Sequence, residues 1–320
     1  MRAIPLLSLL LGGWFVVPAH ADEAQDWLTR LGQAEQQQSF HGTFVYERNG
    51  SFSTHNIWHR VQNGQVRERL LQLDGSAQEV VRVDGHTQCV SGTLIAGLGD
   101  SPNSTARSLD PQKLKNWYDL AVIGKSRVAG RDAVIVSLTP RDQHRYGFEL
   151  HLDKQTGLPL KSLLLNDKGQ LLERFQFTSL DTADAPSDKD LQPGTDCKAI
   201  TLDSDKASAV KTAQVWHSDW LPPGFVLTSS TSHKDPETKT QVSSLMYDDG
   251  LARFSVFLEP LNGATVTDTR TQLGPTVAVS RRLTTPEGEM MVTVVGEIPI
   301  GTAERIALSM RNDGAATSKQ

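Results

Sequence analysis

Hydrophobic and polar positions alternate along residues 151–180, and two glycine-containing turns divide this stretch into strands. In the strand between the turns, Leu163 and Leu165 share one face. In the strand after the second turn, Phe175 and Phe177 share one face in the same way. The pattern predicts an antiparallel meander with one apolar side.

The same two-residue period recurs upstream of this meander. Four Asn-Gly or Asp-Gly dipeptides separate short strands there, and such dipeptides are the strongest short-range signal of a hairpin. The strands predicted upstream are residues 39–47, 53–62, 65–73, 78–83, 87–90, 121–128, 132–139 and 145–152. With the meander they indicate a large curved antiparallel sheet, with enough strands to curl round a cavity without necessarily closing.

Helical spacing interrupts the strands at two places. Apolar residues recur three or four positions apart over residues 26–37. A second short helix is predicted over residues 109–120, where Asp110 can cap the first turn and Pro111 suits it. We expect both helices to cover the concave side of the sheet, and the polar stretch 91–108 to be mobile.

Composition changes after residue 180, where Asp, Ser, Thr and Pro become frequent, as is typical of a linker. A second antiparallel sheet follows, with strands predicted at residues 215–220, 225–231, 241–247, 252–259, 265–273, 277–283 and 290–295, and a closing helix at 301–310. The chain is therefore expected to be α+β and mainly β. The predicted division is a first domain at 22–183, a linker at 184–210, a second domain at 211–312 and a tail at 313–320, with disorder expected from residue 311.

The N-terminus has the features of a cleavable signal peptide. Arg2 precedes an apolar run at residues 4–17, and Ala-His-Ala at 19–21 is a cleavage site. The run is too short for a permanent membrane helix, and no cysteine follows the cleavage site to carry a lipid anchor. We expect an exported, soluble, periplasmic protein. Its net charge of −5 gives no basic footprint for nucleic acid.

The chain has two cysteines, Cys89 and Cys197. Export to an oxidising compartment would allow them to form a disulfide. In the chain-entropy model, closing such a long loop stabilises the fold by up to about 4–5 kcal/mol. Two unpaired thiols are the alternative, and the sequence leaves both open.

Catalytic and metal-binding motifs are absent from the sequence, including H-E-x-x-H, C-x-x-C, G-x-S-x-G and G-x-G-x-x-G. His55 and His59 have the spacing of two metal ligands on a helix. Their surroundings predict a strand, however, and we interpret them as surface histidines. We therefore expect no enzyme, no metal and no cofactor.

Aromatic and aliphatic side chains along the predicted strands of the first sheet have two interpretations. They can fill a packed core, or they can line a partly unfilled cavity that accepts an acyl chain, because each buried methylene contributes about 0.8 kcal/mol. The residues proposed to line a lipid site are Phe44, Tyr46, Trp58, Phe148, Leu163, Leu165, Phe175 and Phe177.

Short stretches in both predicted domains resemble known proteins. L-D-K-Q-T-G-L-P-L-K at residues 152–161, within the hairpin-rich first domain, resembles the periplasmic lipoprotein carriers, which hold acyl chains in an unclosed β-barrel. The second domain has W-L-P-P-G-F at 220–225, M-Y-D-D-G-L at 246–251 and F-S-V-F at 254–257, which those carriers lack. Both domains together, behind a signal peptide, resemble the RseB/MucB family over essentially the whole mature chain.

This resemblance implies a regulator of an envelope-stress sigma factor. Such proteins bind the periplasmic part of a membrane anti-sigma factor of the MucA or RseA type and shield it from regulated proteolysis. Lipid or lipopolysaccharide is the effector that releases them, and alginate production is one output. The family has no established catalytic or metal residues.

Contacts with the anti-sigma factor are expected in the cleft between the domains and on the second domain. Arg281 and Arg282 are candidates there, against the alternative of ordinary solvated charges. Self-association into a homo-oligomer is left open. Two other classes also remain, a periplasmic lipid or lipoprotein carrier and an enzyme acting on envelope glycolipid.

Overall fold

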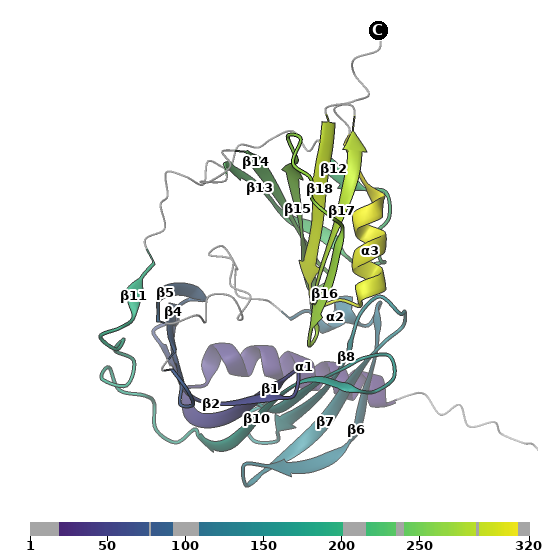
Figure 1. Cartoon of the computed structure of the whole chain (residues 1–320). Coiled ribbons are helices and arrows are strands. Elements are labelled where there is room, and N and C mark those ends of the chain that lie inside the picture. Colours follow the sequence, from purple (N-terminus) through teal and green to yellow (C-terminus); the bar gives the residue numbers. More distant parts are fainter. Residues whose placement is uncertain are drawn as a thin grey trace, which may run out of the picture.

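The computed structural model describes residues 19–76, 78–91, 109–200, 216–234, 240–285 and 288–312. Within these ranges the chain forms two large antiparallel sheets, each with a helix against one face, and a two-stranded sheet (Figure 1). The larger sheet belongs to the first domain and the smaller to the second. The mainly β architecture predicted from the sequence is confirmed.

Eleven strands form the first sheet, in the order β11-β5-β4-β3-β2-β1-β10-β9-β8-β7-β6. In chain order they are β1 Phe40–Arg48, β2 Ser51–Gln62, β3 Gln65–Gln72, β4 Glu79–Val83, β5 His86–Ser91, β6 Tyr118–Val128, β7 Arg131–Pro140, β8 Gly147–Asp153, β9 Pro159–Leu165, β10 Leu171–Asp181 and β11 Lys198–Ala199. The order begins at β11 and ends at β6, so the sheet curves without closing into a barrel. Asn49, Asn63 and Asp84 have positive φ in front of a glycine, as expected for the tight turns between hairpin strands.

Helix α1 (Ala19–Gln37) lies across the concave face of this sheet (Figure 1). Its fully buried Ala24 and Leu28 pack against β6, β7 and β8, and Ala34 packs near Phe40 and Phe177. Burying a leucine side chain of this kind contributes about 1.5–3 kcal/mol. The helical spacing over residues 26–37 therefore predicted both the helix and the face that it buries.

The second predicted helix is much shorter than expected. Asp110 caps α2 (Pro111–Leu114) by accepting hydrogen bonds from two backbone N–H groups, but the helix then ends. Tyr118 instead begins β6, opposite Pro140, and is completely buried. Pairing with β7 satisfies the backbone hydrogen-bonding groups of this segment. The helical spacing of a few apolar residues could not predict this pairing, because the partner strand lies outside the segment.

Six strands form the second sheet, in the order β13-β14-β15-β18-β17-β16. They are β13 Val226–Lys234, β14 Gln241–Asp248, β15 Arg253–Pro260, β16 Thr269–Leu273, β17 Thr276–Thr285 and β18 Gly288–Gly296. Helix α3 (Ile300–Ser309) packs Ala303, Ile306 and Ala307 against one face. The predicted tail is ordered at its start, because β19 (Met310–Asn312) pairs with β12 (Trp216–Ser218).

Residues 182–200, called the connector below, run from β10 along the outside of the first sheet to β11. The connector is held at several points: Asp188 pairs with Arg60 at 2.6 Å, the backbone N–H of Gly194 donates to Glu79 at 2.9 Å, and Cys197 forms a disulfide with Cys89. The first part of the predicted linker is therefore docked rather than loose.

The predicted signal peptide and mobile stretch lie largely outside the described residues, as do residues 201–215 and 313–320. Helix α1 begins at Ala19, inside the last three residues of the predicted signal peptide. Among the described helices, none combines the length and hydropathy needed to cross a membrane.

Candidate functional site

A cavity of about 930 Å³ lies between α1 and the strands β1 to β3 and β10. Its apolar lining includes Phe40, Ile57, Leu158, Phe175 and Phe177. The size falls within the range of small-molecule sites, which are concave and mostly apolar with a few polar groups. The curved sheet and the helix laid across it leave this space unfilled.

The aromatic wall of the cavity is built by strand pairing. Phe44 on β1 lies opposite Phe177 on β10, with ring centroids 5.9 Å apart, and Phe175 lies 4.7 Å from Phe44. Gly42 allows this approach, because a Cβ atom there would overlap the carbonyl oxygen of Ser179. The rings therefore form a continuous apolar surface on the concave face.

His55 and His59 belong to this wall and are not surface histidines. Both are buried, and their rings stack on Phe44 and Phe40 at centroid distances of 5.0 and 4.7 Å. Strand alternation turns them inward together with Ile57. Burial lowers the pKa of His55, against the smaller opposing charge of Asp74.

One end of the cavity is polar. His59 hydrogen-bonds through Nδ1 to Glu68 and through Nε2 to the backbone oxygen of Glu35, both at 2.9 Å. Burial raises the pKa of Glu35, and the neighbouring Glu68 adds to the rise. Burial would also raise the pKa of Glu68, but the hydrogen bond and charge of His59, with the charge of Arg82, outweigh it and lower that pKa. An apolar space that opens onto charged groups suits an amphiphilic ligand.

Five of the eight residues proposed for a lipid site lie on the concave face: Phe44, Tyr46, Phe148, Phe175 and Phe177. Phe175 and Phe177 line the cavity directly. Tyr46 donates a hydrogen bond to Glu173 at 2.6 Å, and Phe148 packs near Leu138 beneath α1. This part of the proposal is compatible with the geometry.

Leu163 and Leu165 lie on the convex face, contrary to the expectation. Leu164 is the buried member of this apolar run and pairs with Phe148, whereas Leu163 pairs with the charged Arg174. Three consecutive leucines satisfy the two-residue period in either phase, so the pattern could not decide which of them faces inward.

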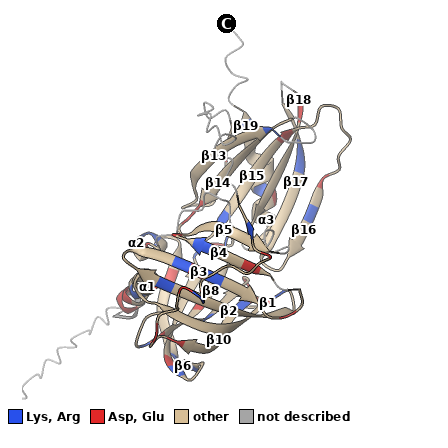
Figure 2. Cartoon of the chain, turned by 90° about the vertical axis from the view of Figure 1, so that its left-hand side faces the viewer, with Lys and Arg blue, Asp and Glu red and all other residues tan. Residues whose placement is uncertain are grey.

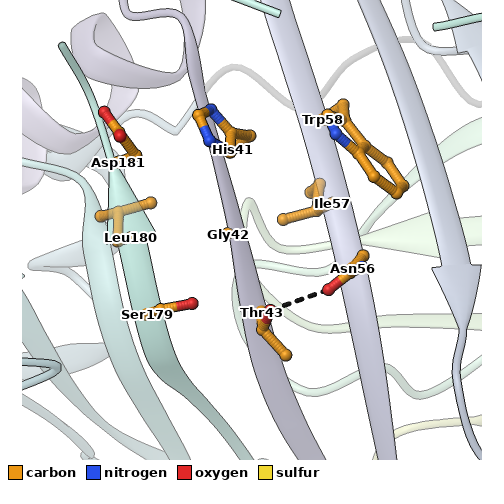
Figure 3. Close-up of a pocket in the computed structure, with 9 residues that line it drawn as sticks. All are labelled: His41, Gly42, Thr43, Asn56, Ile57, Trp58, Ser179, Leu180 and Asp181. Carbon is orange, nitrogen blue, oxygen red and sulfur yellow. Dashed lines mark hydrogen bonds between the residues drawn. The ribbon is translucent and has the colours of Figure 1, made fainter. Parts of the chain in front are cut away.

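Trp58 also faces outward. The guanidinium of Arg69 lies 5.0 Å from its ring centroid. Figure 3 shows the shallow hollow beside Trp58, with His41 and Asp181 along its rim and a 2.8 Å hydrogen bond from Thr43 to Asn56. Trp58 therefore does not belong to the cavity beneath α1.

The sequence interpretation missed the wall contributed by α1 and the β2–β3 hairpin, including Gly32, Gln36, Gly64 and Val66. Three of these residues are glycine or glutamine, Val66 is a single apolar residue between polar neighbours, and no local pattern marks any of them as cavity lining. His59 had a signal, since it follows His55 and Ile57 at the two-residue period of an inward face.

The two domains meet at a buried ion pair. Arg145, in the turn before β8, contacts Asp249 at 2.6 Å, and both side chains have no exposed area. Arg145 also donates to the backbone oxygen of Pro223 at 2.5 Å, and Tyr146 donates to the backbone oxygen of Ile298 at 3.1 Å. These contacts fix the orientation of one domain against the other.

Arg281 and Arg282 point in different directions. Arg281 forms an ion pair with Glu304 on α3 at 2.6 Å. Arg282 is exposed, and its backbone N–H donates to Asp268. The structure therefore gives Arg281 an intramolecular role and does not bring the two guanidinium groups together. Among the described residues, no cluster of His, Cys, Asp and Glu side chains has the arrangement of a metal site.

The fold and the cavity define a class of protein: two β-sheet domains, of which the first half-encloses an apolar ligand space. Comparison with known proteins identifies the family. The model of the MucB/RseB N-terminal domain matches residues 23–195, and that of the MucB/RseB C-terminal domain matches residues 210–311. The chain belongs to the MucB/RseB family, whose members are regulatory binding proteins and not enzymes.

Individual relatives cover nearly the whole chain. It is 62% identical over 318 residues to the sigma factor AlgU regulatory protein MucB of Pseudomonas aeruginosa, and the aligned region covers 99% of each protein. It is 27% identical over 327 residues to the sigma-E factor regulatory protein RseB of Haemophilus influenzae, covering 97% of this chain and 99% of RseB.

Solved structures of MucB are also similar. MucB in the Pseudomonas aeruginosa MucA/MucB complex has a TM-score of 0.81 at 62% identity, covering 91% of this chain and 99% of that one. A crystal structure of MucB alone has a TM-score of 0.68 at 59% identity, covering 91% and 98%.

Proposed function

We propose that this protein is a periplasmic negative regulator of an envelope-stress sigma factor. It binds the periplasmic domain of a MucA/RseA-type anti-sigma factor and protects that domain from regulated proteolysis. The observation that carries the proposal is the 62% identity to an AlgU regulatory protein across 99% of both chains. Export through the signal peptide, with cleavage after Ala21, would place the mature chain in the same compartment as that partner.

The domain arrangement supports partner binding. The chain is more similar to MucB in the MucA/MucB complex than to MucB alone, with TM-scores of 0.81 and 0.68. This difference supports the proposal that the orientation held by the Arg145–Asp249 pair is one that binds the partner. A partner that recognises surfaces of both domains would favour this orientation over others.

The cavity beneath α1 is the proposed site of a lipid or lipopolysaccharide effector. Each methylene of an acyl chain that enters the apolar part would contribute about 0.8 kcal/mol before the cost of ordering the chain. Phe175 and Phe177 would contact the chain, and the charged groups near Glu68 would lie toward its polar end.

Strands β1 and β10 offer a physical route from lipid to partner. On β1, Phe44 belongs to the aromatic wall, and Arg48 at the strand end hydrogen-bonds Thr276 of the second domain and lies 3.9 Å from Glu297. A ligand that shifts the aromatic wall would therefore disturb a contact between the domains. Typical coupling of about 1–3 kcal/mol would weaken partner binding by about 5- to 150-fold.

The test is a pull-down of purified residues 22–320 by the immobilised periplasmic segment of a MucA-type anti-sigma factor, with and without lipopolysaccharide or an acyl lipid. We expect binding that weakens as lipid is added, and slower cleavage of the segment by an added protease when the regulator is bound. If added lipid leaves binding to the anti-sigma segment unchanged, lipid is not the effector. Absence of binding under all conditions would favour a lipid or lipoprotein carrier, which would hand lipid stoichiometrically to an acceptor.

A further inference from the structure

Two arginines lie directly opposite each other on the convex face of the β2–β3 hairpin. Arg60 on β2 is the ladder partner of Arg67 on β3, and the alternation that turns His59 and Glu68 into the cavity turns both arginines outward. Figure 2 shows basic residues along these strands. Like charges in directly opposite positions destabilise a sheet, so this pair requires an anion.

The connector supplies one carboxylate. Asp188 accepts a hydrogen bond from Arg60 at 2.6 Å, and the backbone oxygen of Pro186 accepts another from the same guanidinium. The Arg60 side chain is only 11% exposed, whereas Asp188 is 80% exposed. The hydrogen bond and charge of Arg60, with a smaller effect from Arg67, lower the pKa of Asp188. The carboxylate is therefore ionised but held from one side.

This carboxylate satisfies only half of the site. Among the described residues, no side-chain hydrogen bond or ion pair holds the guanidinium of Arg67, although its charge acts on Asp188, and the Nε atom of Arg60 is buried without an acceptor. The surrounding pocket, of about 490 Å³, is completed by Gln62, Asn63 and Gln65, whose side-chain amides are further donors. Two cationic groups and three amides exceed what one carboxylate with a single charge can engage.

A phosphate monoester fits this donor set better than a carboxylate. It carries a charge of about −1.5 to −2 at neutral pH and three strong acceptor oxygens. Guanidinium groups bind phosphate oxygens in a bidentate geometry, so each arginine could engage its own pair of oxygens. The pocket therefore favours a phosphate over the internal carboxylate of Asp188.

The position of the pocket identifies the kind of molecule that carries the phosphate. The same hairpin separates the pocket from the acyl cavity: Gly64 and Val66 line the cavity, while their neighbours Asn63 and Gln65 line the pocket. An amphiphile bent over this hairpin end would place its chain beneath α1 and its head group on the convex face.

We propose that Arg60 and Arg67 form the head-group site of a phosphorylated lipid, and that Asp188 occupies this site when the lipid is absent. The proposal rests on the proposed function, because it names the head-group chemistry of the effector. Binding would displace Asp188 and free the first part of the connector that leads to the second domain, while the Cys89–Cys197 disulfide keeps its far end attached.

The experiment measures binding of matched probes to mature protein by calorimetry below their critical micelle concentrations. The probes are a lysophosphatidic acid, the monoacylglycerol with the same chain, and inorganic pyrophosphate. We expect the lysophosphatidic acid to bind at least about tenfold more tightly than the monoacylglycerol, as an additional charged hydrogen-bonded contact implies. Weak binding of pyrophosphate would show that the pocket recognises phosphate without a chain.

Variants separate the site from general charge effects. Arg67→Gln should remove most of the preference for lysophosphatidic acid, and the exposed Lys168→Gln, with the same charge change, should preserve it. Asp188→Asn should strengthen phosphate binding, and Asp184→Asn on the same connector should not. Neither Arg67 nor Asp184 contributes an ion pair within the described residues, so both variants are expected to fold.

Equal affinity for both lipids, or an unchanged preference in Arg67→Gln, would overturn the head-group site and leave an acyl-chain effector intact. If neither lipid binds, the effector role in the proposed function fails together with this site. If both lipids bind but neither weakens capture by the anti-sigma segment, only the regulatory role fails. An acidic peptide that competes with pyrophosphate more strongly than the lipid does would assign the pocket to a protein partner instead.

Discussion

Phe175 and Leu163 belong to neighbouring strands but occupy opposite environments. Phe175 lines the cavity beside Phe44 and Phe177, whereas Leu163 lies on the convex face between Arg174 and Glu149. A carboxylate introduced at Phe175 would enter an apolar space, whereas one introduced at Leu163 would meet polar neighbours. The two positions therefore form a matched pair for testing the lipid site.

We expect Phe175→Asp to weaken binding of an acyl-chain probe by at least about tenfold, because an unpaired charge in an apolar site costs more than about 1.4 kcal/mol. Leu163→Asp should bind the probe like the parent protein. Displacement of a fluorescent fatty acid measures both, after circular dichroism has shown that each variant is folded. Equal losses in the two variants would contradict the location of the site.

His55 makes the stability of the first domain depend on pH. Its ring is buried against Phe44, and burial lowers its pKa below the ordinary value of 6.5. The neutral form is therefore favoured in the folded state. The stability from this group is fully present above pH 6.5 and is lost as pH falls through the lowered pKa.

The pH effect is measured as a difference between variants. Urea unfolding between pH 7.5 and 5 should show that the parent protein loses its stability advantage over His55→Gln as the solution becomes acidic. Replacement of the exposed His233 by Gln is the control. A constant difference across this range would show that protonation of His55 does not oppose folding.

At the scale of single elements, composition was least successful for the connector, because it predicted a loose linker where the structure has a docked segment. Its Asp- and Ser-rich sequence is typical of a linker, yet it is held by Arg60, Arg69 and Glu79 on the convex face. Strand β11 then pairs with β5 beside the Cys89–Cys197 disulfide. Long-range partners fix this element, and a local sequence window contains none of them.

The disulfide should make a large contribution to stability. The two cysteines are 108 residues apart, and a closed loop of about that length stabilises by about 4–5 kcal/mol in the chain-entropy model. We expect Cys89→Ala, Cys197→Ala and the double variant to lose similar amounts in denaturant unfolding, since each one removes the same bridge. Reduction of the parent protein should approach the same value. Strictly additive losses in the double variant would instead indicate separate packing effects.

Across the whole molecule, the two domains are joined by close packing as well as by charge. Gly224, with a φ of +92°, lies directly against the ring of Trp117, where a Cβ atom would overlap the indole. The buried Arg145 lies between Trp117, Tyr118 and Phe225 and pairs with Asp249. Removing either partner from such a buried pair typically costs about 3–5 kcal/mol, so this interface specifies one orientation.

Gly224→Ala should separate the domains. The methyl group would collide with Trp117, which adds to the cost of positive φ for a residue with a side chain. Gly263→Ala is the matched control, since its φ of +85° carries the same backbone cost and nothing lies within 4 Å of the added carbon. We expect an increased radius of gyration in solution scattering, and two unfolding transitions in place of one, only for Gly224→Ala. Unchanged scattering would show that the interface can absorb the methyl group.

The sequence by itself determined the strands, their hairpin turns, the first helix and the presence of a large sheet followed by a smaller one. Those features follow from local chemistry: the two-residue period, Asn-Gly and Asp-Gly turns, and apolar residues at helical spacing. The resemblance of short stretches in both domains identified the family before any geometry was known. Phe175 and Phe177 were also assigned to the cavity from the phase of one strand.

Only the tertiary structure decided which face each ambiguous strand turns inward, where the second helix ends and how the domains meet. Leu163 to Leu165 satisfy either phase, and the registry with β8 and β10 selects Leu164. Tyr118 belongs to a strand because it pairs with Pro140 on β7, and its hydroxyl donates to Asp249 of the second sheet's side of the interface. Neither partner lies within a local window of sequence around Tyr118. The contact of Arg60 with Asp188 likewise joins residues more than a hundred positions apart in the sequence. Such choices depend on energies shared between distant segments, which no local pattern contains.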